Sequence, residues 1–174
     1  MPMHALATEP DYPQSLATAS KGAFALLPIS VADPRLEYCL RLAHQNMSLY
    51  LERRGEHFND VRWRELAPQA NFYLIVDDSV LARENVGFFS VRCDPDCPST
   101  LHIGDVQVQA THQNRNAGSQ ALQWIEDLAR SRNLTELTLN VFRDNPALRL
   151  YERVGFQLID TRFYKYKMRK TLHP

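Results

Sequence analysis

The chain has 174 residues, of which 44% are hydrophobic and 23% charged, and this composition is typical of one globular domain with a full apolar core. Lys and Arg together number 20, as do Asp and Glu, so the formal net charge is zero. Such a balance argues against a nucleic-acid partner, whose phosphates require an excess of cations. The sequence also lacks an apolar run of roughly 20 residues and a signal peptide, so we expect no membrane partner.

The cysteines indicate a reduced, cytoplasmic protein. Cys39, Cys93 and Cys97 are odd in number, and their spacing is not that of a disulfide-stabilised domain. Cys93 and Cys97, with His102 and His112, raise the hypothesis of a zinc site. The Cys-x3-Cys spacing is loose, however, and no second ligand pair follows at finger spacing, so we predict no metal. Nothing near Cys97 in the sequence marks its thiol as an activated nucleophile.

The N-terminal region separates into an arm and the start of a domain. Residues 1–22 are rich in Ala, Ser, Thr and Pro without periodicity, which predicts a flexible N-terminal arm before a single domain at 23–174. An apolar strand is expected at 24–29. Asp33-Pro34 then predicts a helix start, since a capping carboxylate precedes a proline at the first helical position, and Gly55 can end that helix.

The remaining chain alternates strands with three further helices. A short helix should precede the first strand pair, and Asn145-Pro146 repeats the start signal of a cap followed by proline, with Gly155 as the stop. Pro95, Pro98 and Ser99 mark a loop between strands. We expect the short helix at 60–66 and strands at 72–76, 86–91, 101–108, 137–141, 156–159 and 163–168.

A polar turn joins the strand that ends at Val108 directly to a helix. The turn contains the cation Arg115, several small residues, and Asn116, a residue that tolerates a left-handed backbone. Such a turn leaves main-chain N–H groups unpaired at a helix N-terminus, where the helix dipole is also positive. The pattern therefore predicts an anion site suited to a pyrophosphate; an ordinary strand-to-helix turn is the alternative.

Two signatures in this half of the chain resemble those of the GCN5-related N-acetyltransferases, the GNAT superfamily. The family's acetyl-CoA-binding motif, Gln/Arg-x-x-Gly-x-Gly/Ala, is similar to Gln113-Asn114-Arg115-Asn116-Ala117-Gly118, with Asn116 in place of the first glycine. The second signature, Asn-x-x-Ala followed by Tyr-Glu-Lys-x-Gly-Phe, resembles Asn145-Pro146-Ala147 and Tyr151-Glu152-Arg153-Val154-Gly155-Phe156. The resemblance covers residues 72–169 well and the first third of the chain loosely.

The resemblance implies an α/β (α+β) fold, with a mixed, largely antiparallel sheet of six to seven strands and helices on both faces. In that fold the fourth and fifth strands run parallel and splay apart, and the cofactor enters the gap between them. The helical crossover between Val108 and Leu137 suits a parallel pair, because parallel strands need a long connection.

The resemblance also implies an acetyl-CoA-dependent N-acetyltransferase that moves the acetyl group to a primary amine by direct transfer. Tyr151 matches the family's general acid near the coenzyme sulfur; a packed structural tyrosine is the alternative. Asn145 is expected to cap its helix and to contact the pantetheine arm. The cofactor-binding residues implied are Val106, Gln107, Val108, Gln113, Asn114, Arg115, Asn116, Ala117, Gly118, Ser119 and Asn145.

The general base has two candidates on the fourth strand, His102 and Asp105. Imidazole titrates near neutrality and could accept the amine proton, whereas a carboxylate could anchor the amine or position a water. Ideal alternation puts the two side chains on opposite faces, but Gly104 between them could mark a β-bulge that re-aims one of them. The structural alternatives are an exposed strand histidine and a hydrogen-bonded aspartate.

The acceptor is expected to be a small-molecule or peptide amine, in a pocket lined by Tyr50, Glu52, Glu56, Trp63 and Phe163. Glu52 and Glu56 equally fit a solvated helix face. A homodimer remains open, since dimers are frequent among similar folds.

Two other functions compete with the enzyme. The first is a non-catalytic acyl-CoA sensor on the same fold, suggested by Asn116 and the unassigned base. The second is an interaction domain that uses the basic run Lys165, Lys167, Arg169 and Lys170, for which a solvated sheet edge is the simpler interpretation.

Overall fold

The computed structural model describes residues 23–79 and 81–173, so the arm predicted at 1–22 lies outside the described residues. In this part of the chain no helix is both long and apolar enough to cross a membrane. The elements, in chain order, are β1 (Phe24–Ile29), α1 (Leu36–Glu52), α2 (Asp60–Leu66), the short 3-10 turn η1 (Ala67–Gln69), β2 (Asn71–Asp77), β3 (Glu84–Asp94), β4 (Cys97–Val108), the 3-10 turn η2 (Ala110–His112), α3 (Ala117–Ser131), β5 (Glu136–Phe142), α4 (Ala147–Arg153), β6 (Gln157–Arg162) and β7 (Lys165–Thr171).

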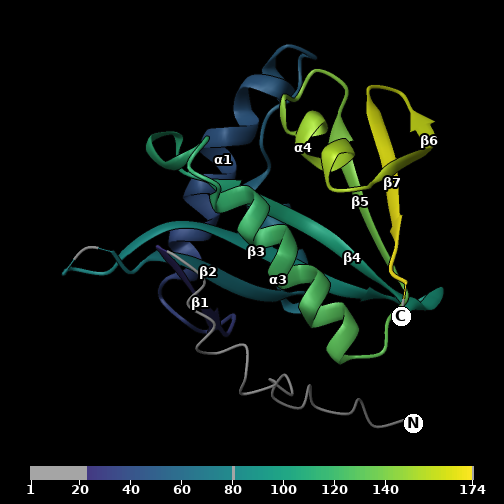
Figure 1. The fold of residues 1–174 in the computed structure, drawn as a ribbon. Helices are drawn as coiled ribbons and strands as arrows, with labels where there is room; N and C mark the ends of the chain where they lie inside the picture. Colours follow the sequence, from purple (N-terminus) through teal and green to yellow (C-terminus); the bar gives the residue numbers. More distant parts are fainter. Residues whose placement is uncertain (1–22, 80, 174) are drawn as a thin grey trace, which may run out of the picture.

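The strands form one seven-stranded sheet in the order β1-β2-β3-β4-β5-β7-β6 (Figure 1). Every neighbouring pair is antiparallel except β4 and β5, which run parallel. The β4–β5 ladder begins at Thr100–Glu136 and ends at Ile103–Leu139, after which the two strands diverge. The expected mixed, largely antiparallel sheet with splayed fourth and fifth strands is therefore confirmed.

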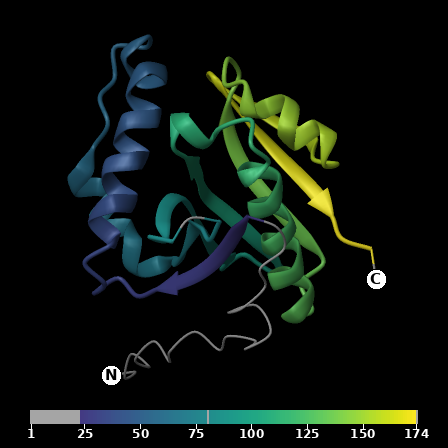
Figure 2. The ribbon, with the colours of Figure 1, turned by 60° about the vertical axis from the view of Figure 1, so that its left-hand side comes forward.

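Helices cover both faces of this sheet, as predicted. On one face α3 packs its buried residues Leu122, Ile125 and Leu128 against the strands, and α4 lies beside it. On the other face α1 buries Leu42 and Ala43 in a second apolar cluster, to which α2 and η1 also contribute. Figure 2 shows α1 and α3 on opposite sides of the sheet. The region where β4 and β5 separate therefore lies between two apolar layers that fix the positions of both strands.

The first helix begins later than the sequence indicated. Helix α1 starts at Leu36, and the Asp33 carboxylate accepts the main-chain N–H of Arg35 at 2.9 Å, so Asp33 caps the preceding turn instead of the helix. The predicted stop is confirmed: Gly55 has φ +70, and the N–H of Glu56 returns to the carbonyl of Leu51 at 3.0 Å.

The loop predicted around Pro95, Pro98 and Ser99 is confirmed only at Pro95, which forms a turn with Asp96, whereas Pro98 and Ser99 lie in β4. Strands β3 and β4 are longer than expected and meet in a tight hairpin, in which Asp94 pairs with Cys97. The register then slips, because Cys93 pairs with Leu101. Pro98 lies in this irregular stretch of β4, where a residue without an N–H removes no ladder hydrogen bond.

Candidate active site

The turn before α3 is held open by two left-handed asparagines. Asn114 has φ +60 and Asn116 has φ +70, so Asn116 adopts the conformation that would otherwise favour glycine. The first main-chain bond of the helix is donated by Gln120 to the carbonyl of Asn116. Within the described residues, the N–H groups from Asn114 to Ser119 donate to no protein atom. The turn thus leaves its donors unpaired at the positive end of α3, which is the backbone arrangement that the pattern predicted and one that suits an anion.

A buried polar contact, which the sequence did not reveal, tethers this turn to the end of β2. His112 Nε2 lies 3.8 Å from a carboxylate oxygen of Asp77, and its Nδ1 lies 2.9 Å from the hydroxyl of Thr111. Hydrogen bonds from Ser79 hold the pKa of Asp77 below its usual range, and the charge of Arg115 lowers it further. Asp77 is therefore an anion at neutral pH that fixes η2 and, through it, the N-terminus of α3.

Strand β4 contains the bulge that Gly104 suggested. Ser90 pairs with Asp105 and Val91 with Ile103, so Gly104 has no partner on β3. A Cβ on Gly104 would lie 2.8 Å from the hydroxyl oxygen of Ser90, which explains the need for glycine.

The bulge brings the two candidate bases to one face of the sheet. Directly paired residues of antiparallel strands share a face, and the partners of His102 and Asp105 are Arg92 and Ser90, two residues apart on β3. Both side chains therefore lie on the α1/α2 face, which strict alternation along β4 would not allow.

Asp105 lies half-buried beneath α2. Its carboxylate accepts a hydrogen bond from the hydroxyl of Ser90 at 3.0 Å. Burial raises the pKa of Asp105, and hydrogen bonds from Ser90, Gln107 and Trp63 oppose that rise. Its carboxylate thus binds a proton more readily than an exposed aspartate does, as a general base requires.

His102 is held neutral. Its Nδ1 lies 3.0 Å from the hydroxyl of Thr138 on β5. Burial lowers the pKa of His102 to about 4, the charges of Arg92 and Lys167 lower it too, and Asp94 opposes them. The ring is uncharged at pH 7 and is a weak proton acceptor.

Tyr151 approaches the gap from the opposite face. It belongs to the apolar cluster under α3, is 8% exposed, and meets the ring of Phe156 edge-on at 5.9 Å. Burial, with a contribution from the negative charge of Asp105, raises the pKa of Tyr151 to about 12, so the phenol keeps its proton at neutral pH. Asp105 and Tyr151 therefore lie on the two sides of the sheet at the same opening.

The main chain of β4 beyond the bulge faces this opening. The N–H of Gln109 bonds to Val86 on β3, so by alternation the polar groups of Val106 and Val108 point away from β3, toward the gap. The carbonyl of Val108 accepts hydrogen bonds from the side chains of Asn46 at 3.2 Å and Gln113 at 3.1 Å. Asn46 also donates to the side chain of Gln107 at 3.1 Å, which ties α1 to the site.

Asn145 has the capping role expected of it, since its side-chain oxygen accepts the N–H of Ala147 at 2.9 Å at the start of α4. Helix α4 in turn approaches α3 closely. A Cβ on Gly118 would lie 3.1 Å from a methyl carbon of Leu150. The two signatures that were separate in the sequence thus meet at one end of the splay.

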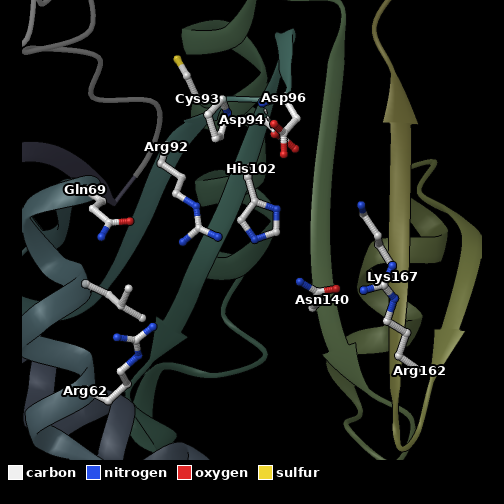
Figure 3. Close-up of a pocket in the computed structure, with 12 residues that line it drawn as sticks. Arg62, Gln69, Arg92, Cys93, Asp94, Asp96, His102, Asn140, Arg162 and Lys167 are labelled. Atoms are coloured by element: carbon white, nitrogen blue, oxygen red, sulfur yellow. Dashed lines mark hydrogen bonds between the residues drawn. The ribbon is translucent and has the colours of Figure 1, made fainter.

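A cavity of about 710 Å³ opens on the α1/α2 face, between α2 and the β6–β7 hairpin (Figure 3). Its floor is formed by β3, β4 and β5, and His102 projects into it. The residues that line it are Arg62, Leu66, Gln69, Arg92, Cys93, Asp94, Pro95, Asp96, His102, Asn140, Arg162 and Lys167.

None of the five residues expected to form the acceptor pocket lines this cavity. Tyr50 stacks on Phe142 at 5.7 Å, and Glu56 accepts a hydrogen bond from Tyr164. Trp63 packs on Phe72 at 5.3 Å and donates to Asp105. Glu52 and Phe163 are exposed. The cavity is instead formed by side chains that are distant in sequence.

The basic run on β7 does not form a solvated edge. Strand β7 lies between β5 and β6, and its cations are engaged separately. Lys170 pairs with Glu126, Arg169 lies 3.7 Å from Glu136, and Lys167 lines the cavity.

The cysteines and histidines of the zinc hypothesis do not converge. Cys93 and Cys97 are free, exposed thiols near the β3–β4 hairpin, whereas His112 lies against Asp77. In residues 23–79 and 81–173, no group of three or more His, Cys, Asp or Glu side chains is arranged to hold a metal ion.

Comparison with known proteins places this arrangement in a family. Residues 39–156 match the sequence profile of the acetyltransferase (GNAT) family. A search of curated protein sequences finds no match.

Several solved structures share the fold. The PaiA N-acetyltransferase of Thermoplasma acidophilum, in complex with coenzyme A, is 17% identical with a TM-score of 0.65, over 86% of this chain and 99% of that one. Ard1 from Thermoplasma volcanium is 18% identical with a TM-score of 0.70, over 88% and 100%. A GNAT family acetyltransferase from Elizabethkingia anophelis with acetyl-CoA bound is 16% identical with a TM-score of 0.64, over 87% and 100%.

The family profile covers more than half of the chain, and the sheet, the splay and the open α3 turn agree with it. The chain therefore belongs to the acetyltransferase (GNAT) family, whose cofactor is acetyl-CoA.

Proposed function

We propose that the protein transfers an acetyl group from acetyl-CoA to a primary amine of a small molecule or peptide, directly and within a ternary complex. The observation that carries the proposal is the arrangement at the splay: unpaired N–H donors at the start of α3, a carboxylate on one face of the gap and a protonated phenol on the other. An acetyl-CoA sensor would need the first of these features only.

The cofactor half of the site fits a diphosphate. The N–H groups from Asn114 to Ser119 and the positive end of α3 can bind its oxygens, and Arg115 adds a nearby cation. The main-chain groups of Val106 and the N–H of Val108, which face the gap, can hydrogen-bond to the pantetheine arm, whereas the carbonyl of Val108 is engaged by Asn46 and Gln113. The amide side chain of Asn145 is a further candidate donor to that arm.

The chemistry requires three groups, and the chain offers one for each. Acetyl-CoA supplies an acetyl group on an activated thioester. Asp105 accepts the proton of the attacking amine as the new C–N bond forms, and N–H groups of β4 at the gap hydrogen-bond to the carbonyl oxygen. Tyr151 donates its proton to the departing sulfur as the C–S bond breaks, which avoids the release of a bare thiolate.

We assign the base to Asp105 in preference to His102. Burial acts on the two groups in opposite directions: it lowers the pKa of His102 to about 4, which weakens the imidazole as a base, and it raises the pKa of Asp105, which strengthens the carboxylate as one. We propose that His102, which projects into the cavity, contacts the acceptor instead.

The test is a turnover assay with a panel of amines, in which release of free coenzyme A thiol is followed and the acetylated product is identified by mass. Acetyl-CoA binding is measured separately by thermal shift. A shift together with release for at least one amine supports the enzyme. A shift with no release across the panel would favour the sensor, and the absence of any shift would contradict both.

A further inference from the structure

The cavity beside His102 is rich in cations. Its lining includes Arg62 from α2, Arg92 from β3, Arg162 from the β6–β7 hairpin and Lys167 from β7. Figure 3 shows these side chains on both sides of the hollow. The carboxylates of the lining are Asp94 and Asp96, next to the β3–β4 turn.

Two of the four cations already have partners. Arg62 lies 3.3 Å from Glu65, and Arg162 lies 2.7 Å from Asp160. Both arginine side chains and that of Glu65 are largely exposed, and that of Asp160 is 42% exposed, so the pairs contribute little and can exchange partners easily.

Arg92 and Lys167 are different. Both are half-buried, they flank His102, and neither lies within ion-pair distance of a carboxylate in the part of the chain that the structure describes. Asp160 pairs with Lys167 across the β6–β7 ladder, but its carboxylate forms its ion pair with Arg162, whose hydrogen bond lowers the pKa of Asp160, and the charge of Lys167 helps to lower that pKa. Partly buried cations without a direct ion pair are costly, which points to a ligand that supplies an anionic group.

The carboxylates of the lining do not supply it. Asp94 accepts the main-chain N–H of Asp96 at 3.0 Å, so it caps the hairpin turn. Figure 3 shows Asp94 and Asp96 together at one end of the hollow, whereas Lys167 lies across from His102, on the β7 side. The middle of the cavity is therefore positive.

The position of the cavity connects it to the reacting groups. Asn140, which lines it, directly follows Leu139, the last residue of β5 paired with β4. His102 and Asp105 share the same face because of the bulge at Gly104. Asp105 does not itself line the cavity, but its partner Ser90 lies two residues along β3 from Arg92, on the same face of the sheet. A molecule in the cavity can therefore reach Asp105 if it extends along this face past the point of divergence.

We infer that the acceptor amine carries an oxyanion, a carboxylate or a phosphate, which binds between Arg92 and Lys167 while its amine reaches Asp105. The inference rests on the proposed acetyl transfer and adds the chemical class of its substrate. A guanidinium and an ammonium that converge on one oxyanion form charge-assisted hydrogen bonds with it. The same charges repel a polyamine, so the cavity selects against purely cationic acceptors.

The probes are amino acids whose α-carboxyl group is blocked as the amide, so that matched pairs differ in one charge. Glutamate amide is compared with glutamine amide for a carboxylate, and phosphoserine amide with serine amide for a phosphate; lysine amide is the cationic arm. Binding of each to the coenzyme A-loaded protein is measured by calorimetry, and turnover is measured with acetyl-CoA. We expect at least one anionic probe to bind tenfold or more tightly than its neutral partner, and lysine amide to bind most weakly.

The double variant Arg92→Gln/Lys167→Gln should weaken binding of the preferred anionic probe at least tenfold and change binding of the matched neutral probe less than twofold. Lys167→Gln alone should give part of this loss. Arg41→Gln, on an exposed arginine of α1 outside the cavity, is the matched control and should change neither.

The two proposals fail in different ways. If anionic and neutral probes bind equally, or if the double variant weakens both alike, the inferred charge selection is wrong, whether or not any amine is acetylated. If anionic probes bind selectively but no amine releases coenzyme A thiol, the cavity assignment stands and the acetyl-transfer proposal falls.

Discussion

The two halves of the candidate site are constructed differently. The cofactor half consists mainly of main chain: the N–H groups at the start of α3 and the polar groups of β4 at the gap. The acceptor half consists of side chains from α2, β3, β4, β5 and the β6–β7 hairpin around a cavity of about 710 Å³. The cofactor half thus depends on backbone conformation, and the acceptor half on which side chains the fold brings together.

This difference explains why a family can keep one cofactor and change its acceptor. A substitution in the cavity alters charge or shape without moving the backbone, whereas a substitution that moves β4 or the α3 turn affects every acceptor alike. Asp105 and Tyr151 lie at the boundary between the two halves, one on each face of the gap, and variants of these residues and of the cofactor half test this division.

Asp105→Asn should have the largest effect. Loss of the base is expected to lower kcat by about 10³-fold. The acid limb of the wild-type pH profile, which rises as the carboxylate loses its proton, should disappear in the variant. Steady-state kinetics with the best amine of the panel measures both. Asp127→Asn, on the outer side of α3, is the control and should keep the limb.

The same variant should not be less stable at neutral pH. Because burial raises the folded-state pKa of Asp105, its contribution to stability is present at low pH and is lost as the pH rises from the ordinary carboxyl pKa through the raised one. Asparagine has no such loss. Urea titrations in which the wild type gains stability relative to the variant as the pH rises would contradict the assignment of a raised pKa.

Gly87→Ala should damage the cofactor half through the backbone. A Cβ there would lie 2.4 Å from the carbonyl oxygen of Gln107, so β4 must move where it faces the gap. We expect a loss of about 3 kcal/mol in unfolding free energy, together with weaker acetyl-CoA binding. Gly55→Ala is the control for a glycine substitution that does not move β4. No atom lies within 4 Å of the added Cβ, so this variant should lose only about 1 kcal/mol of unfolding free energy and bind acetyl-CoA normally. Equal losses of binding in both variants would contradict the account.

Tyr151→Phe tests the proposed general acid, which lies on the α3 face of the gap. Removal of the hydroxyl should lower kcat by about 10²-fold and leave the KM for acetyl-CoA within twofold, because the ring still fills its place beside Phe156. Tyr166→Phe, in which the ring packs against the same apolar cluster, is the control for loss of a hydroxyl elsewhere. Unchanged turnover in Tyr151→Phe would remove its role as the acid.

Asn116→Gly should have the smallest effect. The asparagine already adopts φ +70, so glycine restores the family motif without changing the turn. Unfolding free energy is expected to change by a few tenths of a kcal/mol, and acetyl-CoA affinity by less than twofold. A tenfold gain in affinity would show that the side chain of Asn116 obstructs the diphosphate.

The difference between the cofactor half and the acceptor half also determines how well each could be predicted from the sequence. The α3 turn, the cap at Asn145 and the bulge at Gly104 follow from local residue types, and each is found where it was expected. Local patterns encode backbone conformation directly. The start of α1 was placed too early because Asp33 caps a turn instead.

The acceptor half could not be predicted in this way. Arg92 and Lys167 are 75 residues apart in number and flank His102 only because β3, β4, β5 and β7 are neighbours in the sheet. Lys167 did appear in the sequence as part of a basic run, but the run gave no sign that its members separate onto different partners. The tether between His112 and Asp77 is hidden for the same reason, since it joins η2 to the end of β2.

Both the enzyme and its substrate class depend on the main-chain N–H groups before Ala121, which we propose bind the diphosphate of acetyl-CoA. The most direct measurement is a titration of the ¹⁵N-labelled protein with coenzyme A, followed by the amide resonances of residues 114–119. We predict that these resonances shift together with one saturation curve and that their exchange with solvent slows on binding. Saturable binding of coenzyme A that leaves all of them unmoved would contradict the account.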